Sequence, residues 1–344
     1  MQNKYKENDK KRDLIADYVK AYACLLVVIG HVILGVRKGA NNQIKIPIAS
    51  FWIEQYIWTF HVSLFMFISG YIYNKCGKWH SKSTRLKFLT HKLINLGIPY
   101  LIFSCIYIVI NILMSSSVNT KNQISDIFML WIKPVAQYWF LYSLLWIFFL
   151  FVILDKKFKN WEIIVIIALA SYFLSCINLN IGIFDATLKS SIVFGIGVET
   201  KKLYSKNKTI LNLFVEFIFG TIVGCMLLYL GETKYWFGNQ VARMAGIYAS
   251  ISLIVLITHF NIIKKFFSFI CKYSFQIYLL HTFFTAGTRI VFMKFGVTSY
   301  FLHLICGIIV GVVGPIIISV ICDRIYPLKF IFSPEKILKD KIKI

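Results

Sequence analysis

The sequence predicts an all-α fold, a polytopic transmembrane helical bundle of about ten spans with both termini in the cytoplasm. Residues of the hydrophobic set make up 58% of the 344-residue chain and charged residues only 15%, whereas soluble domains carry about 25% charge. The apolar residues fall into stretches of the length needed to cross ~30 Å of hydrocarbon as helix. Most Lys and Arg residues lie in alternate connections between these stretches, as in membrane proteins of fixed orientation.

Ten apolar stretches follow one another along the chain, and no internal repeat or Pro/Ser-rich linker divides them. The sixth is short and holds Lys189, and Ile124–Ile132 is too short to span and is expected at the membrane interface. We therefore predict one membrane domain, residues 14–322, between a cytoplasmic N-terminal segment, 1–13, and a cytoplasmic C-terminal tail, 323–344. The expected spans are Leu14–Val36, Phe51–Tyr73, Leu93–Ser115, Val135–Leu154, Trp161–Asn178, Phe184–Val198, Ile210–Leu230, Val241–His259, Ser274–Phe292 and Phe301–Cys322.

The first stretch is predicted to be a retained span rather than a secretory signal. Its apolar run of ~23 residues is longer than the apolar core of a signal peptide. It also contains Asp17, Lys20 and His31, and no convincing small-residue cleavage site follows it. The eight cysteines form no C-x-x-C pair, so neither a disulfide framework nor a zinc site is indicated.

The positive charge is explained by membrane orientation. With the N-terminus inside, 27 of the 38 Lys and Arg residues lie in the inner segments, as the positive-inside rule expects. The net charge of +23 therefore does not indicate nucleic-acid binding. The inner segments are residues 1–13, 74–92, 155–160, 199–209, 260–273 and 323–344.

Polar side chains inside the spans are the candidate functional residues, because each is costly in lipid unless it faces a protein interior or a wet cavity. In the first span, Asp17, Lys20, Cys24 and His31 fall on one side of a helix. Lys20 and His31 are almost three turns apart, about 16 Å along the axis. The alternative is a purely structural role for both residues. Lys20 would then extend its ammonium group to the membrane surface, and His31 would form its hydrogen bonds within the bundle.

The second span runs antiparallel to the first and carries Glu54, His61 and Ser69. Glu54 is expected near the depth of His31, and a carboxylate beside a neutral imidazole sets the tautomer and basicity of a general base. Glu54 and His61 are therefore catalytic candidates beside His31.

Two later spans add candidates for substrate binding. Trp139 and Tyr142 open the fourth span, where an interfacial aromatic belt is the favoured interpretation. His281 lies in the inner half of the ninth span and Arg289 in its outer half. Ser69, His61 and Arg289 are the candidate oxyanion stabilisers.

Five motifs in order resemble the integral-membrane acyltransferase 3 family, which O-acylates sugars and polysaccharides. The Lys20 to His31 spacing is similar to that family's first-span cation and histidine. The other four are Phe65-Met-Phe-Ile-Ser69-Gly70-Tyr71, Lys92-Leu-Ile-Asn95 with Ile98-Pro99-Tyr100, Trp139-Phe-Leu, and Tyr278-Leu-Leu-His281. The chain departs from the family at Lys20, where Arg is commoner and offers a bidentate fork. It also departs at Lys92, where Arg is usual, and at Asn95, where the family has a second Arg.

The resemblance implies an O-acyltransferase that moves an acyl group, most simply acetyl from acetyl-CoA, to a hydroxyl of a cell-surface or lipid-linked glycan. It implies His31 as general base or covalent acyl carrier. Lys20 and the basic loop with Arg85, Lys87 and Lys92 would hold the acyl-CoA phosphates. It further implies a multi-pass protein of the cell (inner or plasma) membrane among membrane lipids, with no metal and no nucleic-acid partner. A homo-oligomer is left open.

Two other classes are alternatives. A secondary transporter or glycan flippase would use the same intramembrane charges, but inverted repeats would be expected. A non-catalytic subunit of a glycan-synthesis complex would need no polar stripe on the first span, that is, no row of polar side chains from Lys20 to His31 on one side of the helix. Acyl transfer that depends on His31 would separate the acyltransferase from both.

Overall fold

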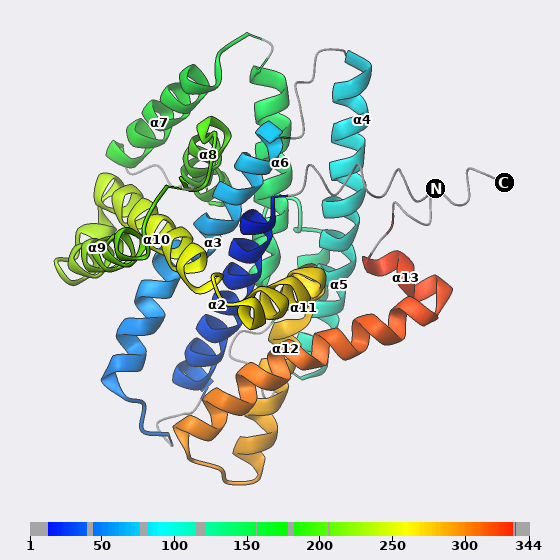
Figure 1. Ribbon diagram of the computed structural model, residues 1–344. Helices are drawn as coiled ribbons and strands as arrows, with labels where there is room; N and C mark the ends of the chain where they lie inside the picture. Colours follow the sequence, from blue (N-terminus) through cyan, green and yellow to red (C-terminus); the bar gives the residue numbers. More distant parts are fainter. Residues whose placement is uncertain are drawn as a thin grey trace.

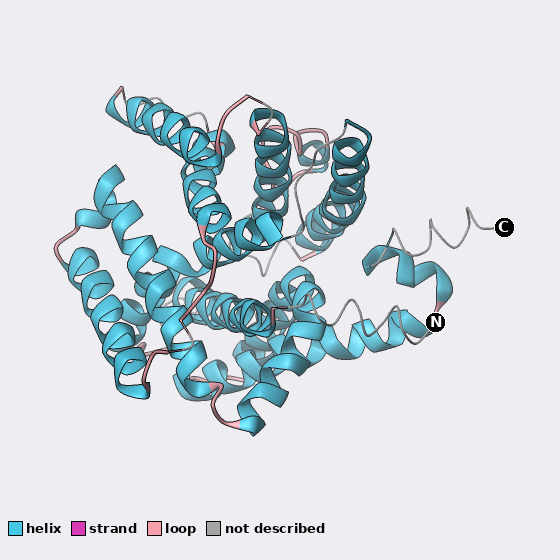
Figure 2. Ribbon diagram, turned by 45° about the horizontal axis from the view of Figure 1, so that its top comes forward, coloured by secondary structure: helices cyan, strands magenta, loops and turns pink. Residues whose placement is uncertain are grey.

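The computed structural model describes residues 13–39, 44–75, 82–114, 122–155, 157–177, 182–205, 207–332 and 334. These residues form helices and loops without a strand, so the expected all-α class is confirmed (Figure 2). Four short elements, η1 (Leu93–Gly97), η2 (Ile124–Ile127), η3 (Ala136–Tyr138) and η4 (Glu232–Lys234), join or precede the α-helices. The α-helices are α2 (Leu14–Gly39), α3 (Ile48–Lys75), α4 (Lys82–Lys92), α5 (Ile98–Leu113), α6 (Trp139–Leu154), α7 (Asn160–Cys176), α8 (Ile183–Glu199), α9 (Ile210–Tyr229), α10 (Trp236–Ile257), α11 (Asn261–Lys294), α12 (Tyr300–Arg324) and α13 (Tyr326–Phe332).

Each of the ten predicted spans overlaps one long helix, α2, α3 or one of α5 to α12. Six helices in the described part of the chain are long and apolar enough to cross a membrane. Of the others, α7 and α8 have 17 residues each, while α3 and α11 carry ionisable side chains. The protein is therefore a helical membrane protein. The count of ten spans and the side of each terminus stay predictions.

The two end segments are only partly within the described residues. Of the N-terminal segment 1–13, the structure describes Asp13 alone, and of the tail 323–344 it describes 323–332 and 334. Lys189, which weakened the sixth predicted span, forms an ion pair with Asp185 one turn earlier in α8, with Nζ 2.7 Å from Oδ2. That pairing lowers the cost of carrying a lysine in an otherwise apolar helix.

The third span contains a π-helical segment, η1, between α4 and α5. Pro99 follows it closely at the start of α5. Proline has no N–H to donate to the carbonyl four residues earlier, and its ring clashes with that carbonyl. The wider i→i+5 pattern of the π-helix accommodates this missing bond. The sequence from Leu93 to Pro99 thus continues as one helix with a local change of winding.

Helix α2 is packed on several sides, by α3, α10, α11 and α12 (Figure 1). Helices α3 and α8 cross where two glycines bring their backbones into direct contact. A Cβ built on Gly70 would lie 2.0 Å from the Phe194 carbonyl oxygen, and one built on Gly197 would lie 2.1 Å from that of Phe67. Glycine at both positions lets the helices approach this closely.

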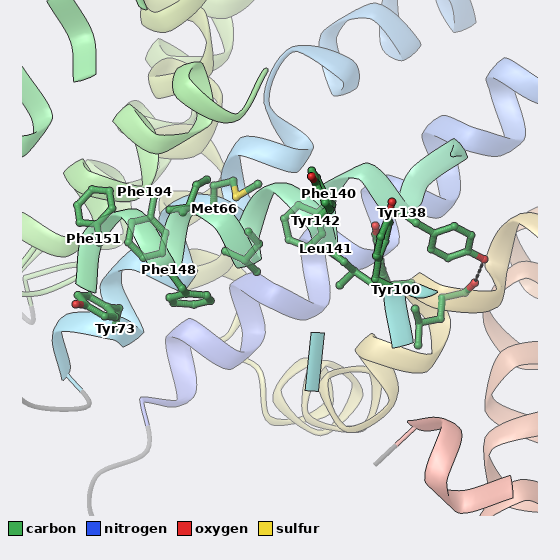
Figure 3. Packing of buried hydrophobic residues seen from close by; sticks show 14 of the residues in the cluster. Met66, Tyr73, Tyr100, Tyr138, Phe140, Leu141, Tyr142, Phe148, Phe151 and Phe194 are labelled. Atoms are coloured by element: carbon green, nitrogen blue, oxygen red, sulfur yellow. Dashed lines mark hydrogen bonds between the residues drawn. The ribbon is translucent and has the colours of Figure 1, made fainter. Parts of the chain in front are cut away.

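An aromatic cluster ties α3, α6 and α8 together (Figure 3). The ring of Phe194 lies 4.8 Å from that of Phe151, 5.4 Å from that of Phe148 and 5.8 Å from that of Tyr73, measured between centroids. Tilted and edge-on contacts of this kind add to the apolar packing. The cluster fixes the end of α3 against α6 and α8.

Candidate functional site

A cavity of about 400 Å³ lies at the end of the bundle where α2 ends. At this end α3 begins and α11 turns into α12 (Figure 1). Its walls come from α2, α5, η3, α11 and α12. Apolar residues supply most of the lining, and a few polar side chains interrupt it, as in binding sites for small molecules. The polar side chains are those of His31, Lys38, Tyr107, Asn111, Gln137, Thr282, Thr285, Arg289 and His303.

His31 is the lining residue of α2 that lies farthest from the cavity end of that helix. Its imidazole ring lies between two other rings. The centroid distance is 5.2 Å to Trp58 of α3, in an edge-on contact, and 5.0 Å to His281 of α11. The two neighbours come from different helices, so the position of the His31 ring depends on how α2, α3 and α11 pack.

His281 is fully buried. Its Nδ1 lies 3.0 Å from the Ile277 carbonyl oxygen and 2.8 Å from that of Tyr278. A carbonyl oxygen can only accept, so Nδ1 carries the proton and Nε2 of the neutral ring keeps a lone pair. That Nε2 is buried and has no hydrogen-bond partner among the described residues. A buried acceptor without a partner is costly, and here it belongs to the ring beside His31.

The His61 ring contacts the Trp58 ring edge-on, with centroids 4.9 Å apart, and His61 does not line the cavity. Its Nδ1 lies 2.8 Å from the Ile57 carbonyl oxygen one turn earlier. His31, His61 and His281 are close enough to interact electrostatically. Within the described part of the chain, no group of three or more His, Cys, Asp or Glu side chains could hold a metal ion.

Glu54 has a different partner from the one that its depth suggested. Arg37 of α2 grips the carboxylate with two hydrogen bonds, Nε to Oε2 at 2.8 Å and Nη2 to Oε1 at 2.7 Å. No hydrogen bond joins Glu54 to His31 in the residues that the structure describes. The prediction that Glu54 orients His31 is therefore wrong. Arg37 lies six residues beyond His31, and its fork matches a carboxylate better than an imidazole does.

Arg289 lines the cavity, as its place in the ninth predicted span suggested. Its Nη1 donates to the Gly35 carbonyl oxygen at 2.6 Å. The guanidinium also packs against Gly39, where a built Cβ would lie 2.2 Å from Nη1. Ser69 and His61, the other two candidate oxyanion stabilisers, are not among the lining residues.

The start of α6 is fastened to α11 beside the cavity. Gln137 Nε2 donates to Thr282 Oγ1 at 2.7 Å, and the Tyr278 hydroxyl donates to the Gln137 carbonyl oxygen. The Tyr138 hydroxyl donates to the Leu279 carbonyl oxygen at 2.8 Å. These hydrogen bonds fix the cavity wall that Gln137 forms against the part of α11 that carries His281.

Tyr142 belongs to the interior rather than to an interfacial aromatic belt. It is buried, and its hydroxyl donates to the Trp131 carbonyl oxygen at 2.6 Å. Trp139 is half-buried and packs against the large buried apolar cluster to which Tyr142 also belongs. Neither residue lines the cavity. A main-chain acceptor replaces the interfacial water that a belt tyrosine would use, which is why the belt interpretation fails for Tyr142.

Lys20 lies toward the opposite end of α2 from the cavity. Its Nζ is 4.0 Å from Asp17 Oδ1, and its side chain is 34% exposed. The helical rise places it about 16 Å from His31 along the axis. Cys24, the other member of the predicted stripe, is buried and its Sγ lies 3.4 Å from the Ser274 carbonyl oxygen. The stripe therefore faces α11 at its centre.

Asp13 fixes the Lys20 end of α2 to the end of α3. Its Oδ1 caps the helix by accepting from the Ile15 and Ala16 amides, and its Oδ2 accepts from Tyr71 at 2.5 Å and Lys75 at 2.6 Å. Burial would raise the pKa of the Asp13 carboxyl, but the hydrogen bonds from Lys75, Tyr71 and the Ala16 amide outweigh it and hold this pKa below its usual value.

The basic stretch with Arg85, Lys87 and Lys92 lies on α4, at the same end of the bundle as Asp13. Lys92 Nζ lies 4.3 Å from the ring centroid of Phe148 and 5.1 Å from that of Phe88. Phe88 also contacts Tyr73 near the end of α3. Arg85 is half-buried and Lys87 is exposed. The structure thus groups these cations at the end opposite the cavity.

Several residues of the site were not among the sequence-based candidates. Trp58 lies one turn after Glu54 and one turn before His61, so it is on the same face of the helix as these two candidates. That position could have identified it from the sequence. Gln137 directly precedes the aromatic residues that open α6. Nothing local distinguishes Asn111, Thr282 or His303 from polar residues that merely fill a bundle.

Comparison with known protein families gave a match. A family model described as an acyltransferase domain matches residues 14–320, from the start of α2 into α12. Comparisons with curated proteins and with solved structures gave no match.

Proposed function

Because the chain belongs to the acyltransferase 3 family, we propose that it transfers an acyl group, most simply acetyl, from acyl-CoA to a hydroxyl of a cell-surface or lipid-linked glycan. One observation supports this proposal above the others. His31 lies on the wall of a cavity with several polar lining residues at one end of the bundle, and Lys20 lies on the same helix toward the other end. In this proposal the donor and the acceptor approach one imidazole from opposite ends of α2.

The donor end suits a phosphate-bearing molecule. Lys20 and the α4 cations Arg85, Lys87 and Lys92 supply positive charge there, and ammonium and guanidinium groups are the usual partners of phosphates. The offset of about 16 Å between Lys20 and His31 is one that an extended pantetheine arm can span. In this proposal the CoA phosphates bind near Lys20, and the thioester reaches His31.

The acceptor end suits a sugar. The hydroxyl and amide side chains of the cavity lining, among them those of Gln137 and Thr282, match the hydrogen-bonding groups of a glycan. His31 removes the proton from an acceptor hydroxyl as its oxygen attacks the thioester carbonyl. The C–S bond breaks, CoA leaves as thiolate and takes a proton from the imidazolium, and the products are an ester and CoA. A covalent acyl-His31 intermediate is the alternative route.

His281 acts as a positioning residue in this scheme. The lone pair on its Nε2 accepts an N–H from His31, which leaves the other His31 nitrogen deprotonated and able to act as the base. With the ring centroids 5.0 Å apart and the planes at 59°, this bond needs a change of ring orientation, and hydrogen bonds at catalytic sites commonly become well aligned only in the substrate complex.

The test uses purified protein, radiolabelled acetyl-CoA and a glycan pool from the cells that make the protein. Wild type is expected to label glycan, and His31→Ala is expected to lose about 10²–10⁴-fold in rate. His259→Ala is a matched control, because His259 is exposed and does not line the cavity, and it should behave as wild type. Equal labelling by wild type and His31→Ala would reject the role of His31. Glycan movement across vesicles without labelling would favour a transporter.

A further inference from the structure

The charged residues of the cavity lining are both cations. Lys38 and Arg289 line the cavity, and no Asp or Glu is among the described residues that do so. Glu54 lies in the part of α3 nearest the cavity end of the bundle, and both of its carboxylate oxygens accept hydrogen bonds from Arg37. The cavity therefore carries a positive potential that its own walls do not neutralise with a carboxylate, and a low-dielectric wall strengthens such a potential.

Arg289 is held in place rather than free to leave the cavity. Only 9% of the residue is exposed. One guanidinium donor is used by the Gly35 carbonyl oxygen at 2.6 Å, and the absence of a side chain at Gly39 leaves space for the guanidinium group. A guanidinium has five N–H donors in a fixed fork. The described structure accounts for one of them, so the others can recognise a ligand.

The end of α2 alone does not account for this arginine. Carbonyl dipoles at a helix C-terminus favour a nearby cation, and α2 ends at Gly39. That helix end carries roughly half an elementary negative charge, which is less than the combined charge of Arg289 and of Lys38 in the last turn. The interaction also leaves most of the guanidinium donors unused. The two cations therefore carry more positive charge than is needed to offset the partial negative charge at the end of α2.

The position of Arg289 relative to His31 sets the geometry of recognition. Gly35, whose carbonyl holds Arg289, lies one turn beyond His31 on α2, about 6 Å along the axis. A hydroxyl at His31 and an anionic group at Arg289 would therefore be separated by about the width of one sugar ring. Carboxylate and phosphate are the groups that match a guanidinium fork.

We propose that the acceptor is anionic, namely a glycan in which the acylated hydroxyl lies within one sugar residue of a carboxylate or phosphate. Arg289 binds that group, and Lys38 at the exposed rim attracts it. This inference rests on the proposed acyltransferase function and adds the charge class of the acceptor.

The experiment begins with the glycan pool and labelled acetyl-CoA, using the purified full-length protein. The pool is separated on an anion exchanger into neutral and anionic fractions. One portion of the anionic fraction has its carboxylates reduced to alcohols, and another is dephosphorylated. Wild type should label the anionic fraction, and one of the two treatments should lower that labelling, which identifies the anionic group.

The variants test Arg289 itself. Arg289→Gln should raise KM for the anionic glycan about 10- to 100-fold, the loss expected for a charge-assisted hydrogen bond, and should leave KM for the neutralised glycan near that of wild type. Arg289→Lys should be intermediate, because it keeps the charge without the fork. Lys294→Gln removes one charge from an exposed position of the same helix, does not alter the cavity lining, and should behave as wild type.

Three results would overturn the inference: label in the neutral fraction, labelling that survives both treatments, or an Arg289→Gln variant with unchanged KM. If Arg289→Gln does not fold, Lys38→Glu carries the test, because Lys38 is exposed. It should raise KM for the anionic glycan alone, and equal effects on both glycans would contradict the inference. A wild-type protein that labels no fraction would reject the proposed function itself.

Discussion

The imidazole rings of His31 and His281 lie with their centroids 5.0 Å apart and their planes at 59°. One ring belongs to α2 and the other to α11. The backbone contacts of His281 Nδ1 leave its Nε2 as a buried acceptor without a partner in the described structure. This pairing replaces the expected pairing of His31 with Glu54, and it makes the tautomer of His281 a testable part of the site.

His281→Ala should lower kcat for acyl transfer at least about tenfold, because a base in the wrong orientation loses part of the 10²–10⁴-fold that general base catalysis contributes. His281→Gln should restore part of the rate, since its amide oxygen can occupy the place of the Nε2 acceptor. The pH profile of kcat should change in His281→Ala and return in His281→Gln. A purely structural role would lower the amount of folded protein and leave the profile unchanged.

Lys20→Glu should weaken binding of acetyl-CoA at least tenfold and leave acceptor KM nearly unchanged. The variant places a carboxylate beside Asp17 at the donor end, where it repels phosphate. Lys20→Arg should bind as well as wild type. Lys294→Glu makes the same change of charge at the cavity end of α11 and serves as the control. Unchanged CoA affinity in Lys20→Glu would argue against a donor site at that end.

Glu54→Gln should destabilise the protein by about 2–3 kcal/mol with normal transfer per folded molecule. Removing one partner of a buried ion pair costs about 3–5 kcal/mol, and the cost is smaller here because the Arg37 side chain is 32% exposed. Thermal unfolding and activity of the folded fraction measure the two effects. The double variant Glu54→Gln with Arg37→Gln should recover stability. A stable but inactive Glu54→Gln protein would return Glu54 to a catalytic role.

Gly70→Ala should cost about 1–3 kcal/mol or more, because its methyl group would overlap the Phe194 carbonyl oxygen and force α3 and α8 apart. Gly287→Ala is the matched comparison for stability, since a built Cβ there meets no atom within 4 Å. It should be neutral or stabilising, as alanine is the better helix former. Similar unfolding temperatures for the two variants would contradict the close crossing.

Asp13→Asn should lower stability by about 1–2 kcal/mol near neutral pH, where the ionised carboxylate caps α2 and binds Lys75 and Tyr71. The pKa of Asp13 is lowered in the folded protein. Its contribution is therefore complete above the ordinary carboxyl pKa and is lost as the pH falls through the lowered value. The difference in melting temperature between wild type and Asp13→Asn should shrink on acidification. A constant difference would exclude the ionised carboxylate as the cause.

Much of the fold was predictable because its causes are local. The ~30 Å thickness of the hydrocarbon core sets the length of an apolar span, so ten apolar stretches could be located and each overlaps a helix. Helical periodicity likewise placed Lys20 and His31 on one side of α2 and about 16 Å apart. The family followed from short motifs within these helices, and the match over residues 14–320 confirms it.

The partners of the site residues were decided by tertiary structure alone. Depth in the membrane brought Glu54 level with His31 but could not show that Arg37, also on α2, would take both carboxylate oxygens. Tyr142 was expected at an interface and is buried, because a main-chain carbonyl supplies its acceptor. Periodicity gives the face and depth of a residue on its own helix, while the rotation and crossing of neighbouring helices determine which side chains meet. For that reason only the packed bundle could bring His281 to His31 and Arg289 to Gly35.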